Sequence, residues 1–187
     1  MEDRKKIIEM KIKEEEFVEM LQLQGVKQLV WNILTKDKGF EPKEIEISPE
    51  VNIQLSNCDA VVSVDFIINL PQASFMVIRS VPAAIESWER YVVAFARAVK
   101  EYQIPYAAVT DGEKVKVFHA ITGSVIRDGL NGLFSRQEAV ELMKYFEKIP
   151  CPEKRLEKEK RIIYAFEGIK CPTPKPEASP KDSPEDR

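Results

Sequence analysis

Hydrophobic residues recur at helical spacing in the first part of the chain. Residues 4–20 place apolar side chains on one side of a helix whose other side is crowded with Glu and Lys. A second helix is expected over residues 22–36, and Lys38-Gly39 supplies its stop signal. The pattern therefore predicts two helices before the first strand.

From residue 44 onward the apolar pattern becomes strand-like. Residues 44–47 alternate between polar and apolar positions, as a half-buried edge strand does, whereas residues 60–64 and 74–78 are short apolar runs typical of buried strands. Asp65, at the far end of the first of these runs, is expected to begin a hairpin turn. This part of the chain should form the core of a sheet.

The remaining elements alternate between helices and strands. A strongly amphipathic helix is expected from Ile85 to Tyr102, and Asp111-Gly112 predicts a hairpin between two further strands. The capping-box pattern Ser135-Arg136-Gln137-Glu138 opens another helix, and residues 153–169 predict the last one. The expected domain organisation is a helical arm (1–21), an α/β domain (22–150), a C-terminal helix (151–171) and a disordered tail (172–187).

Composition narrows the classes of function. The chain has 28 Lys and Arg against 31 Asp and Glu, a formal net charge of -3, which argues against strong nonspecific DNA binding. It contains neither GxxxxGK[ST] nor GxGxxG, so ATP is not expected as a ligand. No apolar run is long enough to span a membrane, and the three cysteines lack CxxC spacing. A cytoplasmic protein with free thiols, without a membrane segment, is expected.

Three segments carry a resemblance to a known family. They are Cys58-Asp59-Ala60-Val61-Val62, Met76-Val77-Ile78-Arg79-Ser80-Val81-Pro82 and Ile104-Pro105-Tyr106-Ala107-Ala108-Val109-Thr110-Asp111-Gly112. Their order resembles the N-terminal nuclease domain of type I restriction enzyme R subunits, a branch of the PD-(D/E)xK nuclease superfamily. The resemblance implies a restriction-endonuclease-like mixed β-sheet flanked by helices, here with added N- and C-terminal helices.

The family resemblance also implies a site. In these nucleases two carboxylates on adjacent strands hold Mg²⁺, while a Lys positions the attacking water. Asp59 matches the first carboxylate. Aligning Ser80 with the family's Lys places Ile78 at the second carboxylate, and aligning Arg79 there instead places Val77 at that position. Tyr91 stands where the family has Gln.

These departures lead us to expect a stand-alone domain that does not cleave DNA and acts as a nucleic-acid-binding or protein-interaction module. Its partner would be DNA or a restriction-type complex, with no cofactor. One alternative is an active Mg²⁺-dependent DNA endonuclease in which Asp59 binds the metal, Glu86 or Glu89 supplies a migrated acid and Arg79 replaces the Lys. Another is a structural domain that forms a homo-oligomer through its first helix.

The remaining candidate residues divide between surface and core. Lys154, Arg155 and Lys158 form the one concentrated basic segment, which predicts either phosphate contacts or a solvated, salt-bridged helix. The single histidine, His119, shares a strand face with apolar residues and is expected to be structural. Trp31 and Trp88 lie on apolar helix faces and are expected to pack in the core.

Overall fold

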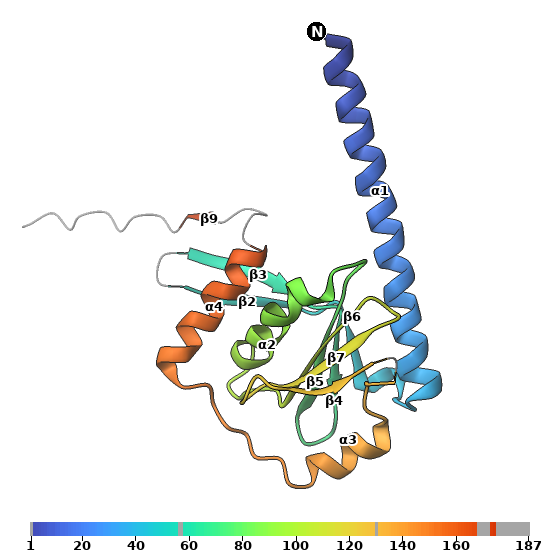
Figure 1. The fold of residues 1–187 in the computed structure, drawn as a ribbon. Helices are drawn as coiled ribbons and strands as arrows, with labels where there is room; N and C mark the ends of the chain where they lie inside the picture. Colours follow the sequence, from blue (N-terminus) through green and yellow to red (C-terminus); the bar gives the residue numbers. More distant parts are fainter. Residues whose placement is uncertain (1, 56–57, 130, 168–172, 175–187) are drawn as a thin grey trace, which may run out of the picture.

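The computed structural model describes residues 2–55, 58–129, 131–167 and 173–174. Helices flank both faces of a six-stranded mixed sheet, which confirms the expected α/β class (Figure 1). The helical segments are α1 (Glu2–Asn32), η1 (Ile33–Asp37), η2 (Pro42–Glu44), η3 (Ile85–Trp88), α2 (Glu89–Ala98), α3 (Arg136–Met143) and α4 (Glu153–Glu167). The strands are β1 (Ile45–Ile47), β2 (Glu50–Gln54), β3 (Cys58–Ser63), β4 (Phe66–Asn69), β5 (Ser74–Ser80), β6 (Tyr106–Thr110), β7 (Val115–His119), β8 (Val125–Asp128) and β9 (Thr173–Pro174).

The large sheet has the strand order β1-β4-β5-β6-β7-β8. Only β5 and β6 pair in parallel within it, and α2 lies in the crossover that connects them. The predicted edge strand is β1, and the predicted hairpin joins β6 to β7 through Gly112, whose φ of 93° requires the freedom of glycine.

A second, smaller sheet contains β2, β3 and β9. The predicted strand at residues 60–64 is therefore outside the large sheet, paired with β2. The chain changes sheets between Ser63 and Phe66, so Asp65 lies at a bend between two strands that do not pair with each other. The expected hairpin at Asp65 was wrong, because local apolar runs do not reveal which strands pair.

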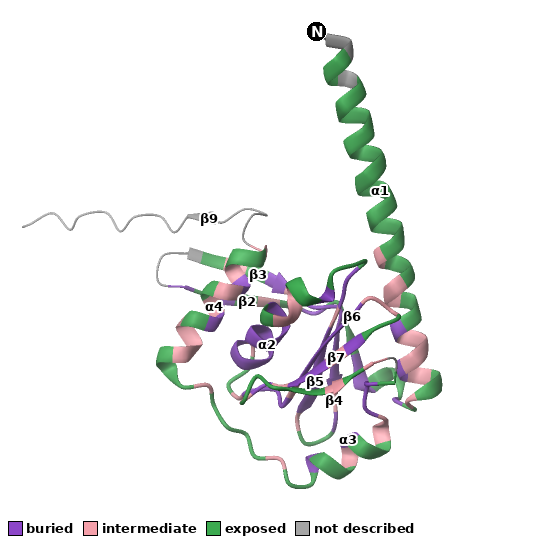
Figure 2. Cartoon of the chain, in the orientation of Figure 1, coloured by how far each residue is buried: buried purple, intermediate pink, exposed green. Residues whose placement is uncertain are grey.

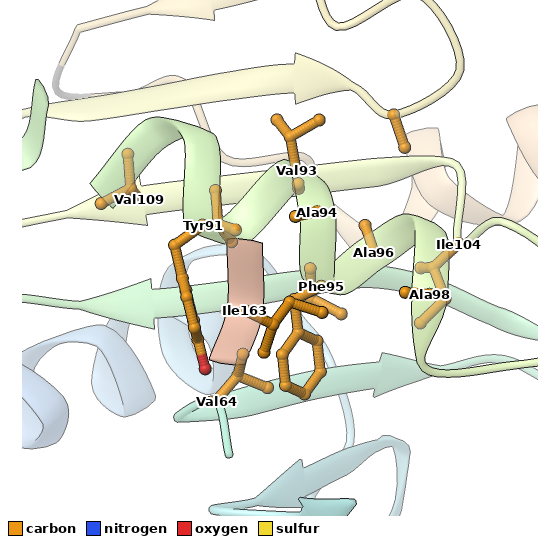
Figure 3. Close-up of a cluster of buried hydrophobic side chains, with 14 of the residues drawn as sticks. Val64, Tyr91, Val93, Ala94, Phe95, Ala96, Ala98, Ile104, Val109 and Ile163 are labelled. Carbon is orange, nitrogen blue, oxygen red and sulfur yellow. The ribbon is translucent and has the colours of Figure 1, made fainter. Parts of the chain in front are cut away.

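Each face of the large sheet has its own core. Val77 and Val109 face α2 and α4, where Phe95 of α2 packs beside Ile163 of α4 (Figure 3). Ile78 lies in the other core, which includes Val30 of α1, Leu34 of η1, and Ala139 and Met143 of α3. Alternation along β5 thus assigns each of its side chains to one of two helical layers.

The first helix is continuous where two helices were predicted. The α1 helix runs without a break through residue 21, where one predicted helix ended and the next began, and it also includes Gly25. The helical path continues through η1 and stops at Lys38-Gly39, where Gly39 has a φ of 76°, as predicted. The first turns of α1 project away from the sheet and are exposed (Figure 2).

The helices α2 and α3 can be compared with the two helices predicted after Ile85 and Ser135. The predicted helix over Ile85–Tyr102 is shorter, because η3 precedes α2 and the helix is capped at Val99. The capping box at Ser135 is present, with its side chain accepting a hydrogen bond from the backbone N–H of Glu138. Both helices nevertheless lie on opposite faces of the sheet, as a flanked α/β fold requires.

Other expectations concern the ends of the chain. Cys151 is a free thiol, and burial raises its pKa; Cys171, the side chain of Cys58 and tail residues 172 and 175–187 lie outside the described residues. Within the described chain, no helix combines the length and apolar character needed to cross a membrane.

Candidate functional site

Asp59 lies in the small sheet. It is the second residue of β3, its backbone pairs with Gln54 of β2 and Thr173 of β9, and it is exposed. Because β5 belongs to the other sheet, Asp59 is not on a strand adjacent to Ile78 and Ser80. The structure therefore does not bring the predicted carboxylate together with the other motif positions.

Asp65 is the carboxylate that lies beside the end of β5. Its backbone N–H donates to the carbonyl of Ile78 over 3.1 Å, and its Oδ2 accepts a 2.5 Å hydrogen bond from the backbone N–H of Ser80. Its Oδ1 is 2.6 Å from the ammonium of Lys27, which reaches it from α1. The Asp65 side chain is 3% exposed, so both of its oxygens are engaged inside the protein.

The other motif positions on β5 are apolar or uncharged. Ile78 is fully buried in the core below α1 and α3, and Val77 is fully buried in the core below α2 and α4. Ser80 is also buried, and its hydroxyl has no hydrogen-bond partner in the structure. Neither alignment of the motif supplies a second carboxylate on this strand.

Arg79 points toward the α2 and α4 side and is held there by several contacts. Its guanidinium lies 4.7 Å from the ring centroid of Trp88 and 3.6 Å from a carboxylate oxygen of Glu167. Tyr91 closes this cluster, because its hydroxyl is 2.7 Å from the carbonyl of Ser63 and 2.8 Å from Glu167. Burial, together with Glu167, raises the pKa of Tyr91. These side chains connect α2, β5 and α4.

The two candidates for a migrated acid are engaged elsewhere. Glu89 lies 2.6 Å from the ammonium of Lys116 on β7, and Glu86 lies 3.7 Å from the same nitrogen. The hydrogen bond that Lys116 donates to the Glu89 carboxylate raises the pKa of Lys116. Lys116 lies between Val115 and Val117, whose side chains are in the same core as Ile78. Because side chains alternate along a strand, Lys116 and its two Glu partners lie on the opposite face of the sheet, on the α2 side.

The residues at the end of β5 do not fit a Mg²⁺ site. Mg²⁺ prefers octahedral coordination by oxygen, commonly with carboxylates and water. Asp65 offers one carboxylate, already paired with the Lys27 cation, and the second position holds Ile78. Over the whole described part of the chain, no three His, Cys, Asp or Glu side chains gather in a way that could hold a metal ion.

A cluster of arginines surrounds one buried carboxylate between α2 and α4. Arg97 donates to Glu159 over 2.9 Å, Arg155 donates to it over 3.3 Å, and Arg90 lies 2.7 Å from its other oxygen. All three guanidinium groups line a cavity of about 430 Å³, whereas Glu159 is 1% exposed. Glu86 and Glu89 also line this cavity, so its three arginines are balanced by three carboxylates, Glu159 included.

The predicted basic segment lies on α4 beside this cavity. Arg155 points inward, to Glu159 and to the carbonyl of Ile121, so it has a structural contact. Lys154 and Lys158 are exposed, and their i, i+4 spacing places them on the same side of the helix. The structure thus divides the predicted basic segment into one packed arginine and two solvent-facing lysines.

Sequence reasoning missed the role of Asp65 and of Lys27. The apolar residues 66–68 that directly follow Asp65, and their short connection to β5, were the available signal for a strand adjacent to β5. Lys27 had no comparable signal, because it is one of many charged residues in a long helix. Its contact with Asp65 depends on how α1 packs against the sheet.

Comparison with known proteins identifies the family. Neither the curated proteins nor the solved structures gave a match to this chain. A profile of the family described as Type I restriction enzyme R protein N terminus matches residues 24–133, more than half of the chain. The matched segment begins in the part of α1 that approaches the sheet and includes all six strands of the large sheet. The chain therefore belongs to the type I restriction enzyme R protein N-terminal family.

Proposed function

We propose that this chain is a non-cleaving member of its family that binds the backbone of double-stranded DNA. The observation that carries the loss of cleavage is the ion pair between Lys27 and Asp65 beside Ile78 and Ser80. A buried carboxylate that is already neutralised by an ammonium group, with no second carboxylate beside it on β5, is a poor ligand set for a divalent cation.

DNA binding is supported by the family and by two solvent-facing lysines on α4. Lys154 and Lys158 are exposed and lie on one side of α4. Lys and Arg bind phosphate oxygens without reading sequence. Because the chain as a whole is acidic, we expect weak binding, with a dissociation constant of about 10⁻⁴–10⁻⁶ M.

Fluorescence anisotropy with a labelled duplex tests this proposal. The wild-type chain should bind, and Lys154→Glu with Lys158→Glu should weaken binding about tenfold at low salt. The slope of log affinity against log salt should become shallower by about two, because two phosphate contacts are lost.

The matched control is Lys36→Glu with Lys114→Glu, which changes the net charge equally at two other exposed lysines. It should retain the wild-type salt slope. An equal loss of DNA affinity in both double variants would show that binding depends on net charge rather than on α4. If the wild-type chain did not bind DNA, a protein partner in a restriction-type complex would be the next candidate.

A further inference from the structure

The first turns of α1 form an arm that the rest of the described chain does not cover. Side chains are exposed at residues 4–5 and 7–22, and the arm extends away from the sheet (Figures 1 and 2). Large apolar side chains are among them, including Phe17 at 57% exposure. The arm is the free part of a 31-residue helix, and an uncovered apolar surface of this size indicates a packing partner.

Five of the eight large apolar residues exposed on the arm form a stripe on the side that faces away from the body. At about 100° per residue, these five fall within an arc of about 100°. They are Ile7, Met10, Phe17, Val18 and Leu21. The side of α1 that packs on the sheet through Val26 and Val30 is about 150° around the helix axis from the centre of the stripe. Ile8 and Ile12 lie on the same side of the helix as Val26 and Val30, and Met20 lies between the two sides. Bending the arm onto its own domain would leave the stripe exposed.

Charge along the arm changes sign near its middle. The half before Glu14 carries Arg4, Lys5, Lys6, Lys11 and Lys13, with Glu9 as the one acidic residue among residues 4–13. The following half carries Glu14, Glu15, Glu16 and Glu19 and no basic residue up to residue 21. Two parallel arms would place like charges together, whereas two antiparallel arms would place each basic half beside an acidic half.

We infer that two copies of this chain associate through their arms as an antiparallel helix pair. The spacing of the stripe fits a two-fold axis at Glu14, because Ile7 and Leu21 are each seven residues from it and Met10 and Val18 are each four residues from it. This axis would place the Glu14 carboxylates of the two copies side by side, a like-charge contact that weakens the pair.

The dimer should be reversible. The arm of residues 4–21 is about 27 Å long at a rise of about 1.5 Å per residue, which makes a small interface. We therefore expect a dissociation constant of about 10⁻⁶–10⁻⁵ M for the intact chain. This association uses a different surface from the proposed DNA contacts, and its measurement without DNA is independent of them.

Sedimentation equilibrium of the intact chain over about 1–100 μM tests the pairing. The wild type should show a monomer–dimer equilibrium. Lys5→Glu, Lys11→Glu and Lys13→Glu together should give a monomer, and so should Glu15→Lys, Glu16→Lys and Glu19→Lys together. An equimolar mixture of these two triple variants should restore the dimer, since each basic arm then meets an acidic one. Lys36→Glu, Lys100→Glu and Lys114→Glu, which change exposed body lysines, should leave the dimer intact.

A second pair of variants tests the apolar stripe. Phe17→Asp should weaken association at least tenfold, whereas Tyr145→Asp, at a body residue that is 84% exposed, should not. A monomeric wild type at 100 μM would overturn the inference. Dimers that persist in the triple arm variants, or a mixture that stays monomeric, would overturn the antiparallel arrangement.

Discussion

At the scale of single residues, the pair formed by Lys27 and Asp65 determines the character of the site. Asp65 is nearly inaccessible, and it is stabilised by the Lys27 ammonium and the Ser80 backbone N–H. A buried charge without such partners is costly, so the pair acts as part of the structure. A site used for metal binding would need the same oxygens to be available to the ion.

The stability contribution of this pair can be measured. Lys27→Ala should lower the free energy of unfolding by about 2 kcal/mol, because it leaves the Asp65 carboxylate buried beside a single N–H donor. Urea denaturation at neutral pH would measure it, with the exposed Lys36→Ala as a control that should change stability by less than about 0.5 kcal/mol. A change in Lys27→Ala no larger than that of the control would show that the pair contributes little.

The sequence was less informative about individual residues than about elements. Asp59 and Asp65 both flank the same apolar run, and only the change of sheet between β3 and β4 places Asp65 beside Ser80. The replacements at Val77, Ile78 and Ser80 were readable directly, because the motif fixes their spacing. Lys27 is 38 positions before Asp65 in the chain, and such a contact has no local pattern.

At the scale of elements, the capping box of α3 shows how a local motif acquires a tertiary contact. Arg127 of β8 donates to Glu138 over 2.8 Å, and the backbone N–H of Ser135 donates to the same carboxylate over 2.7 Å. Chiefly the hydrogen bond from Arg127, and then that from Ser135, lowers the pKa of Glu138 to about 2. The motif predicted the helix start, but not the connection to β8.

This cap should give α3 a pH-dependent stability. Since the folded-state pKa of Glu138 is below its ordinary value of 4.5, its charged form stabilises the protein above about pH 4.5, and that stability is lost as the pH falls toward 2. Glu138→Gln should therefore destabilise the protein by about 1 kcal/mol at pH 7, a figure reduced for the 45% exposure of the side chain, and by less at pH 3.

Urea unfolding of both proteins at pH 7 and pH 3 measures the difference. Glu141→Gln, at an exposed ion pair on the same helix, is the matched control and should have a small effect at both values. If Glu138→Gln lowered the free energy of unfolding equally at pH 7 and pH 3, the charge of Glu138 would not be what stabilises this cap.

Elements with strong local signals were predictable, and those defined by tertiary packing were not. The hairpin at Gly112 and the start of α3 were predicted from turn and cap residues. The short strand β8, with its largely exposed residues, had no apolar run to mark it. The uninterrupted α1 was not predicted either, because the apolar pattern changes near residue 21, where the helix continues without a break.

At the scale of the whole molecule, three surfaces have separate roles in this account. The domain belongs to the restriction-enzyme family, but the residues at the end of β5 do not fit a metal site. The exposed lysines of α4 are the proposed DNA contacts, and the arm is the proposed dimer contact. An antiparallel pair of arms would hold two domains apart, which would allow two weak DNA contacts to act together. The overall charge of -3 then limits affinity without excluding binding.

The central claim is that this domain does not hydrolyse DNA, and a cleavage assay tests it most directly. Supercoiled plasmid and single-stranded DNA would be incubated with the wild type, Asp59→Ala and Asp65→Ala in the presence of Mg²⁺ or Mn²⁺. We expect intact DNA with all three proteins and both metals. Metal-dependent cleavage by the wild type that disappears in Asp59→Ala or in Asp65→Ala would contradict it.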